Sequence, residues 1–242
     1  MPITSKQNEL VKKIRKLSDR KWRQQYGEYI AEGKRWVNDA LSVCPENVAA
    51  VICAENAPFE KADVVLDTQL FASLSDTENS QGVMAILRMP PPAVDFAGRY
   101  CLFLDRVRDP GNMGAIIRTS CAAGYRDIVL NDCVDVYNPK VIRSSMTGIL
   151  SVRFHYAQDL QKVKAAGFTV VAAALGGADV FAEPFTAQKI CLVIGNEADG
   201  IGEDLRKECE RTVTIPMESD IESLNAAVSA GILMYTIKYG KE

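Results

Sequence analysis

Apolar residues along this 242-residue chain fall into two patterns. Short, nearly continuous runs of Val, Ile, Leu and Phe are typical of strands that are buried in a sheet. Between these runs, apolar residues recur at every third or fourth position, as they do on one face of a helix. The alternation of the two patterns predicts an α/β fold.

The first half of the chain predicts a small α/β layer structure. Its expected elements are a helix over 8–20, a strand-like segment over 27–33, a helix over 34–41, strands over 48–52 and 64–66, a helix over 68–74 and a strand over 83–87. Three consecutive prolines, Pro90 to Pro92, then interrupt the pattern and favour an extended spacer. We therefore expect a first domain over 1–92 and a second domain over 99–242.

The second half predicts a doubly wound sheet. The expected strands are 100–104, 127–130, 152–156, 169–174, 190–194 and 213–215, and the expected helices are 114–123, 139–150, 160–166, 203–208 and 224–239. Strands that are apolar almost throughout indicate a parallel sheet that is covered on both faces.

The distribution of charge separates the N-terminal segment from the rest of the chain. The formal net charge is −3, but residues 1–36 carry ten Lys or Arg against four Asp or Glu, which gives +6 there and −9 elsewhere. A basic segment on an acidic body favours binding to phosphate groups such as those of RNA. A solvated helix face is the alternative. The expected RNA-binding residues are Lys12, Lys13, Arg15, Lys16, Lys21, Arg23, Lys34 and Arg35.

Aromatic residues interleave with these basic ones. Trp22 and Tyr26 interleave with Lys21 and Arg23, an arrangement that is compatible with base stacking as well as with core packing. For Tyr29, inside the strand-like segment, we expect core packing.

Other features argue against several classes of function. The seven cysteines are scattered and form no CxxC pair, so we expect reduced core residues and neither zinc nor disulfides. The only histidine, His155, lies away from every glycine-rich loop, which argues against a Ser-His-Asp centre. No apolar run approaches the roughly 20 residues that span a bilayer, and the N-terminus lacks a signal-peptide core. We therefore expect a cytoplasmic protein without membrane segments or metal.

Three polar loops follow three apolar runs and concentrate the candidate chemistry. The first lies in LFLDRVRDPGNMGAIIRTSCAAGYRDIVL (102–130), the second is Gly195 to Gly200, and the third runs from Ile215 to Asn225. Such loops meet at one edge of a parallel sheet, where open α/β folds bind ligands. They therefore predict one composite site, although the glycines of the first loop taken alone are also compatible with a simple turn.

A dinucleotide site is the first rival interpretation. Asp132 follows Gly111 by about 20 residues, as an acidic residue does in that fingerprint. The glycine pattern, however, is G-N-M-G instead of G-x-G-x-x-G, and Arg118 has no place in it. We therefore do not expect a nicotinamide or flavin enzyme.

In their order and residues, the three loops resemble the motifs of the SpoU (TrmH) family of RNA ribose methyltransferases, within the SPOUT superfamily. The resemblance covers residues 100–239. More weakly, YIAEGKRWVNDAL and SQGVMAIL resemble the ends of the substrate-binding domain that often precedes this catalytic domain, which is similar to a ribosomal-protein RNA-binding fold. The resemblance implies a deep trefoil knot in the C-terminal domain.

The resemblance also implies S-adenosylmethionine as cofactor and a homodimer with sites near the interface. Small residues early in the last helix, such as Ala227 and Ala230, permit close approach of helices, and packing against their own sheet is the alternative. The cofactor-binding residues that it implies are Ala174, Leu175, Gly176, Gly195, Asn196, Gly200, Ile215, Met217 and Leu224. For Ile215 and Leu224, ordinary core packing is compatible with that role.

The catalytic residues implied by the resemblance are Asn112, Arg118, Glu197, Ser223 and Asn225. Because a guanidinium stays protonated, we favour Arg118 as a phosphate clamp and alkoxide stabiliser, with proton removal by water, phosphate or Glu197 left open. Asn112 and Asn225 are expected to orient that arginine and the loops. Ser223 is either a site residue or the N-cap of the last helix.

The resemblance, with the residues that carry it, implies a methyltransferase that uses S-adenosylmethionine and acts on a ribose 2′-hydroxyl of RNA. Ribosomal RNA is favoured over tRNA because a separate α/β domain precedes the catalytic one. A non-catalytic RNA-binding or ribosome-assembly protein of the same fold is the alternative from another class. Loss of Arg118, Glu197 or Asn225 would have favoured that alternative, and all three are present.

Overall fold

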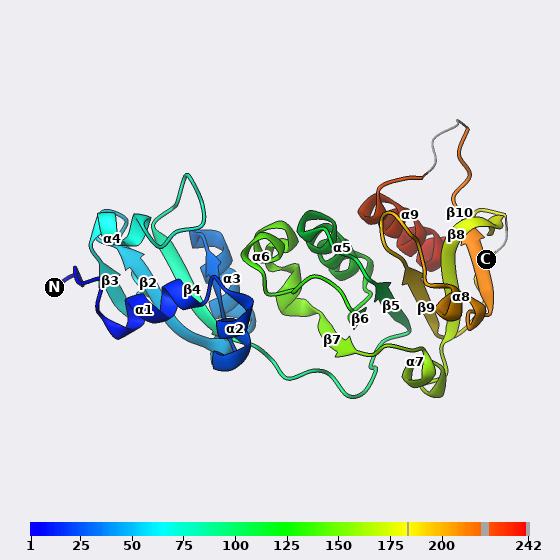
Figure 1. Ribbon diagram of the computed structural model, residues 1–242, viewed down its shortest axis with the longest axis horizontal. Helices are drawn as coiled ribbons and strands as arrows, with labels where there is room; N and C mark the ends of the chain where they lie inside the picture. The colour runs from blue at the N-terminus through cyan, green and yellow to red at the C-terminus, as the bar shows by residue number, and fades with distance from the viewer. Residues whose placement is uncertain (183, 219–222, 241–242) are drawn as a thin grey trace. The chain divides into compact units, whose positions relative to one another are not determined.

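The computed structural model describes residues 1–182, 184–218 and 223–240 (Figure 1). The chain divides into two compact units, which we call the first unit (1–91 with 137–150) and the second unit (92–136 with 151 onward). The segment 137–150 groups with the first unit, although we expected it in the second domain; the domain boundary itself stays a prediction. In the described residues, no helix is long and apolar enough to cross a membrane.

The first unit is built on a four-stranded sheet in the order β1-β4-β2-β3. Its strands are β1 (Glu28–Glu32), β2 (Val48–Ala54), β3 (Val64–Leu66) and β4 (Val83–Arg88), and its helices before residue 91 are α1 (Glu9–Lys16), α2 (Arg20–Tyr26), α3 (Lys34–Val43) and α4 (Thr68–Ala72), with the short 3-10 helix η1 (Pro45–Asn47). Ile14 and Leu17 pack with Ile52 and Met84 in one buried cluster. The apolar face of the first helical segment therefore belongs to the core.

The single helix expected over 8–20 is in fact two helices. Asp19 starts α2, because its side chain accepts a hydrogen bond from the Lys21 N–H at 2.9 Å. The Arg23 guanidinium donates to the carbonyls of Leu17 and Ser18 at 2.9 and 2.7 Å, which satisfies groups that the end of α1 leaves unpaired. The spacing of apolar residues stays helical across the boundary between α1 and α2, so the sequence pattern did not reveal that the helix ends there.

The segment 137–150 packs within the first unit. It contains α6 (Pro139–Ser145) and most of the 3-10 helix η2 (Met146–Ser151), which ends one residue beyond the segment. The continuous helix that we expected over 139–150 ends early because Met146 adopts a positive φ of 52°. The indole N–H of Trp36 donates to the Met146 carbonyl at 3.1 Å, and the Tyr29 and Tyr137 rings lie 4.9 Å apart.

The second unit contains a six-stranded sheet in the order β10-β8-β9-β5-β6-β7, and all its pairings are parallel. The strands are β5 (Tyr100–Asp105), β6 (Asp127–Asn131), β7 (Arg153–Tyr156), β8 (Thr169–Asp179), β9 (Ile190–Ile194) and β10 (Arg211–Thr214), and the helices are α5 (Pro110–Ala123), α7 (Gln161–Ala165), α8 (Glu203–Lys207) and α9 (Ala226–Tyr239). Phe103 and Val193 pack with residues of α7 and α8 on one face. The predicted parallel sheet is thus confirmed, whereas the knot stays a prediction.

Helices α5 and α9 pack together with their N-termini at the same end. Near the C-termini, the Lys238 ammonium donates to the Ala123 carbonyl at 2.7 Å. Ala230 is fully buried within the unit, and a Cβ added at Gly231 would lie 3.5 Å from Thr119 of α5. The expectation that Ala230 lies at a subunit interface is therefore wrong, because it serves packing inside the unit, whereas Ala227 is partly exposed and its role stays a prediction.

Asp127, at the start of β6, is a fully buried carboxylate. It accepts hydrogen bonds from the Gly98 N–H at 3.1 Å and from His155 Nε2 at 2.9 Å, and it pairs with Arg153. Burial raises the pKa of Asp127, but the His155 and Gly98 hydrogen bonds and the Arg153 charge outweigh burial and lower the pKa overall. The stability that Asp127 contributes is therefore present above its ordinary pKa of 3.8 and is lost as the pH falls further.

We expect Asp127→Asn to lower the free energy of unfolding at pH 7 by about 2 kcal/mol, since charged hydrogen bonds are lost. The difference from the wild type should shrink once the pH falls below about 3.8. Urea unfolding measured across pH 3 to 7 tests this, with the exposed Asp95→Asn as the control. A difference that grows as the pH falls would contradict the assignment.

Candidate active site

The three polar loops meet at the edge of the second unit's sheet where its parallel strands end. The Asn225 amide donates to Asn112 Oδ1 at 2.8 Å, and the Asn112 amide donates to Glu197 Oε1 at 3.0 Å. We call these three residues the Asn225–Asn112–Glu197 chain. One residue comes from each of the three loops, so the predicted composite site is a continuous hydrogen-bonded arrangement.

Two helix N-termini hold the asparagines in place. Asn225 is the N-cap of α9, since its Oδ1 accepts from the N–H groups of Ala227 and Val228 at 2.9 and 3.3 Å. Asn112 lies in the first turn of α5, which Asp109 caps by accepting from the Asn112 N–H at 2.7 Å. Because a helix N-terminus carries partial positive charge, the first turn of α5 favours the Glu197 carboxylate that Asn112 binds.

Ser223 is not the N-cap of the last helix, which was one of the two roles that the sequence suggested for it. Asn225 fills that position, while Ser223 is exposed and lies directly after the undescribed residues 219–222. Its role as a site residue stays a prediction.

Arg118 lies further along α5 than the other candidate residues. A helix rises ~1.5 Å and turns ~100° per residue, so six residues place Arg118 ~9 Å beyond Asn112 and on another face. Its side chain is exposed, and among the described residues no hydrogen bond or ion pair joins it to Asn112 or Asn225. The asparagines orient each other and Glu197, and Arg118 is left accessible to a ligand.

The loop from Gly195 to Gly200 is closed tightly on itself. Asn196 and Gly200 exchange backbone hydrogen bonds at 2.9 and 3.0 Å, and the Asn196 amide donates to the Arg106 carbonyl at 2.8 Å. A Cβ added at Gly195 would lie 2.2 Å from the Gly200 carbonyl carbon, so only glycine fits there. The Asn196 side chain thus joins two loops, and a direct cofactor contact from this residue would come from its backbone.

Asp105 is a structural residue of the site that the sequence did not single out. It is 1% exposed, and its carboxylate accepts from the Asn131 amide at 2.8 Å and from the Gly202 N–H at 2.9 Å. Arg106, which has a positive φ of 56°, donates to the same carboxylate at 3.1 Å. Asp105 therefore ties the ends of β5 and β6 to the loop after β9. An acidic residue ending an apolar run was the signal that could have identified it.

The residues expected to hold a cofactor border an irregular part of the sheet. The pairing of β8 with β10 skips from Ala172 to Ala178, so residues 173–177 bulge out of the ladder at Ala174, Leu175 and Gly176. Cβ atoms added at Gly176 or Gly200 would meet no atom within 4 Å. Both backbones are therefore open to a ligand. Ile215, Met217 and Leu224 are partly exposed after β10 and before α9.

The expected RNA-binding residues all lie in the first unit. Lys16 and Lys21 lie over the Trp22 ring at 4.4 and 5.6 Å from its centroid, and Trp22 stacks on Tyr26. The others that remain exposed or partly exposed are Lys12, Lys13, Arg15, Lys34 and Arg35. Arg23 is a correction: it is 2% exposed and caps carbonyls of its own fold, so it does not present a cation to a ligand.

Chemically, the site offers a held carboxylate and an accessible guanidinium beside open glycine backbone. Glu197 can accept a proton or a hydrogen bond, and Arg118 can bind phosphate or a developing oxyanion. The arrangement suits transfer of a group to a hydroxyl of a phosphate-bearing substrate.

Comparison with known proteins agrees with this chemistry. The SpoU rRNA methylase family model matches residues 99–235, and the MRM3-like substrate binding domain model matches residues 8–85. The Bacillus subtilis 23S rRNA (guanosine(2553)-2'-O)-methyltransferase RlmP is 31% identical, over 98% of this chain and 98% of its own.

Solved structures extend the similarity over nearly the whole chain. An AdoMet-bound rRNA methyltransferase from Sinorhizobium meliloti is 28% identical with a TM-score of 0.85, over 98% of this chain and 97% of that one. The SpoU methyltransferase AviRb from Streptomyces viridochromogenes, in complex with AdoMet, is 26% identical with a TM-score of 0.84, over 96% and 97%. The chain therefore belongs to the SpoU rRNA methylase family.

Proposed function

We propose that this protein transfers a methyl group from S-adenosylmethionine to a ribose 2′-hydroxyl of ribosomal RNA in the cytoplasm. The observation that carries the proposal is the Asn225–Asn112–Glu197 chain, because it brings the family's three motifs into one site. RlmP and a 23S rRNA (uridine(2479)-2'-O)-methyltransferase from Streptomyces viridochromogenes, 36% identical over 63% of this chain, support ribosomal RNA as the substrate class. A Synechocystis relative, 30% identical over 96% of this chain, is named a tRNA/rRNA methyltransferase, which supports tRNA as the second candidate.

S-adenosylmethionine fits the open backbone around the bulge in β8. The cofactor supplies an electrophilic methyl group when bound. Gly176 and Gly200 allow close approach of a ligand because neither presents a side chain there, and the partly exposed Ile215 and Leu224 offer apolar contact. These residues would bind and orient the cofactor.

Arg118 and Glu197 have different roles toward the substrate hydroxyl. Arg118 is exposed and permanently charged, so it can bind an RNA phosphate and stabilise the alkoxide as it develops. Glu197 has one oxygen fixed by Asn112, which positions the carboxylate to accept the hydroxyl proton. Water or an RNA phosphate would be the proton acceptor if Glu197 only orients the loop.

Purified protein tests the proposed function with labelled S-adenosylmethionine and RNA from a strain that lacks its gene. We expect labelled ribose 2′-O-methyl groups in ribosomal RNA. Label in tRNA alone would favour the second candidate, and label in neither RNA would contradict the enzyme assignment.

In the same assay, Arg118→Ala should lower single-turnover methylation about a hundredfold, which is the scale of effect when one electrostatic donor is removed, with little change in cofactor affinity.

Arg118→Lys should restore little of this activity, because one ammonium cannot reproduce a planar two-point contact with phosphate and ribose. Lys162→Ala, an exposed cation on α7, is the matched control and should remain active. Full activity of the alanine variant would remove Arg118 from the mechanism. Parallel loss of cofactor binding would instead assign it to support of the first loop.

We also propose a homodimer that forms through the outer face of α9. Val228, Tyr235 and Tyr239 are 51%, 45% and 63% exposed, and with the partly exposed Ile232 they follow helical spacing along one stripe. A second copy of the chain can cover this stripe with its own, since a two-fold interface uses the same surface twice. Ala230 lies on the opposite, buried side and plays no part.

Val228→Glu should convert the dimer to a monomer, because a charge within such an interface is left unpaired and buried. Sedimentation velocity measures the change. Val43→Glu, an equally exposed valine at the end of α3, serves as the control and should leave the dimer intact. A monomeric and fully active wild-type protein would contradict the dimer proposal.

A further inference from the structure

Two neighbouring hollows in the first unit have no role in the function proposed so far. We call them the Arg35 hollow, of about 310 Å³, and the Arg15 hollow, of about 270 Å³, because each arginine lines only one of them. Four residues line both: Glu32, Trp36, Thr77 and Arg143. The two hollows therefore form one groove, with arginines in both parts and Arg143 at their junction.

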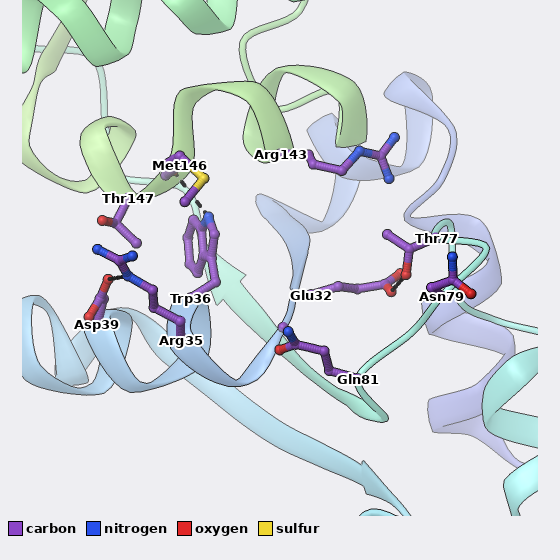
Figure 2. A pocket seen from close by; sticks show the side chains of 11 residues that line it. Glu32, Arg35, Trp36, Asp39, Thr77, Asn79, Gln81, Arg143, Met146 and Thr147 are labelled. Carbon is purple, nitrogen blue, oxygen red and sulfur yellow. Dashed lines mark hydrogen bonds and ion pairs between the residues drawn. The ribbon is translucent and has the colours of Figure 1, made fainter.

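An aromatic wall of fixed orientation lies in this groove. Figure 2 shows the Trp36 indole in the middle of the Arg35 hollow, beneath Met146. Trp36 is 6% exposed, and its indole N–H donates to the Met146 carbonyl at 3.1 Å. Because the residue is buried and its N–H is satisfied, only the small part of the ring that borders the hollow is left, and it offers apolar contact to a nucleobase.

Amide side chains lie at the edge of the same hollow. Gln81 Oε1 accepts from the Lys34 N–H at 2.8 Å, so its NH₂ group remains available. Asn79 is exposed and makes no hydrogen bond with another described residue. An amide carries both donors and acceptors, and such groups can bind the edge of an unpaired base.

The charges that line the groove are balanced. Its cations are Arg15, Arg35 and Arg143, and its anions are Glu32, Asp39 and Asp76. Both Glu32 oxygens already accept hydrogen bonds, from Ser75 Oγ at 2.7 Å and from the Asp76 N–H at 2.8 Å. A lining of zero formal charge disfavours a polyphosphate and suits a phosphodiester, which carries one charge per nucleotide.

Two exposed contacts join Arg143 to Asp76. Its Nη1 donates to the Asp76 carbonyl at 3.2 Å, its Nη2 lies 3.3 Å from Asp76 Oδ2, and the two side chains are 47% and 59% exposed. An ion pair this exposed contributes little stability, so an RNA phosphate can replace the carboxylate.

We propose that this groove binds two consecutive unpaired nucleotides of the RNA substrate, one base in each hollow, with Arg143 at the phosphodiester between them. The inference rests on the proposed function because it takes RNA as the ligand. The size of the hollows supports it, since about 310 and 270 Å³ lie at and just below the small end of ligand pockets and suit a base better than a large cofactor. Arg15 also belongs to the basic segment 1–36, whose charge favours RNA over an acidic or apolar protein partner.

Fluorescence of the full-length Trp22→Phe variant tests the proposal, because Trp36 is then the only tryptophan. Dinucleoside monophosphates and nucleoside 5′-monophosphates of all four bases are the probes. We expect saturable quenching by a dinucleotide at concentrations about tenfold below those of its mononucleotide. Arg143→Ala should weaken dinucleotide binding about tenfold, as loss of a charged hydrogen bond does, whereas Asp76→Asn should strengthen it by removing a competing charge.

Two exposed residues of the first unit provide matched controls. Lys61→Ala removes one positive charge and Asn56→Ala removes one amide outside both hollows, and neither should alter binding. Asn79→Ala should weaken binding of at least one base. Absence of saturable quenching, equal losses in the controls, or weaker binding by Asp76→Asn would overturn the proposal and make the groove a packing gap only.

The methylation assay separates this inference from the proposed function. Arg143→Ala should raise the KM for RNA and leave cofactor affinity unchanged. If the KM stays at the wild-type value, the groove is not an RNA site even though the enzyme assignment holds. If dinucleotides bind at Trp36 but no RNA is methylated, the enzyme assignment fails and the groove remains.

Discussion

The structure of the site depends on three loops being held together at the carboxyl edge of a parallel sheet. Backbone topology brings them to that edge, but only side chains can fix their distances. The Asn225–Asn112–Glu197 chain does this with two hydrogen bonds between amides and a carboxylate. Because Asn225 also caps α9, the start of that helix and the position of Glu197 depend on each other.

Buried residues support the geometry of the Asn225–Asn112–Glu197 chain. Asp105 fixes the loop after β9 against the end of β5, and Gly195 allows that loop to fold back at a distance no side chain would permit. Such support leaves the accessible groups, Arg118 and the backbone of Gly176 and Gly200, to meet ligands. Buried residues that fix the loops, together with accessible groups that can contact ligands, favour the positioning of two substrates.

Much of the fold could be predicted because its signals are local. A continuous apolar run such as 190–194 needs no tertiary information to be identified as a buried strand. The motif residues could be placed in one site because parallel strands end at one edge. Arg23 could not be predicted, since a basic residue in a basic helix resembles a solvated one until the carbonyls at the end of α1 bind it. The grouping of 137–150 with the first unit likewise depends on distant contacts, such as that between Trp36 and Met146.

A double-mutant cycle on single-turnover methylation tests most directly whether the residues of the Asn225–Asn112–Glu197 chain act together. Asn225→Ser keeps a good N-cap but removes the amide donor to Asn112, and Glu197→Gln keeps the shape of the acceptor but removes its charge. We predict that the double variant loses far less activity than the two single losses combined, with a coupling of about 1 kcal/mol or more in the activation free energy. Losses that add within about 0.3 kcal/mol would show that the two residues act independently and would contradict the account.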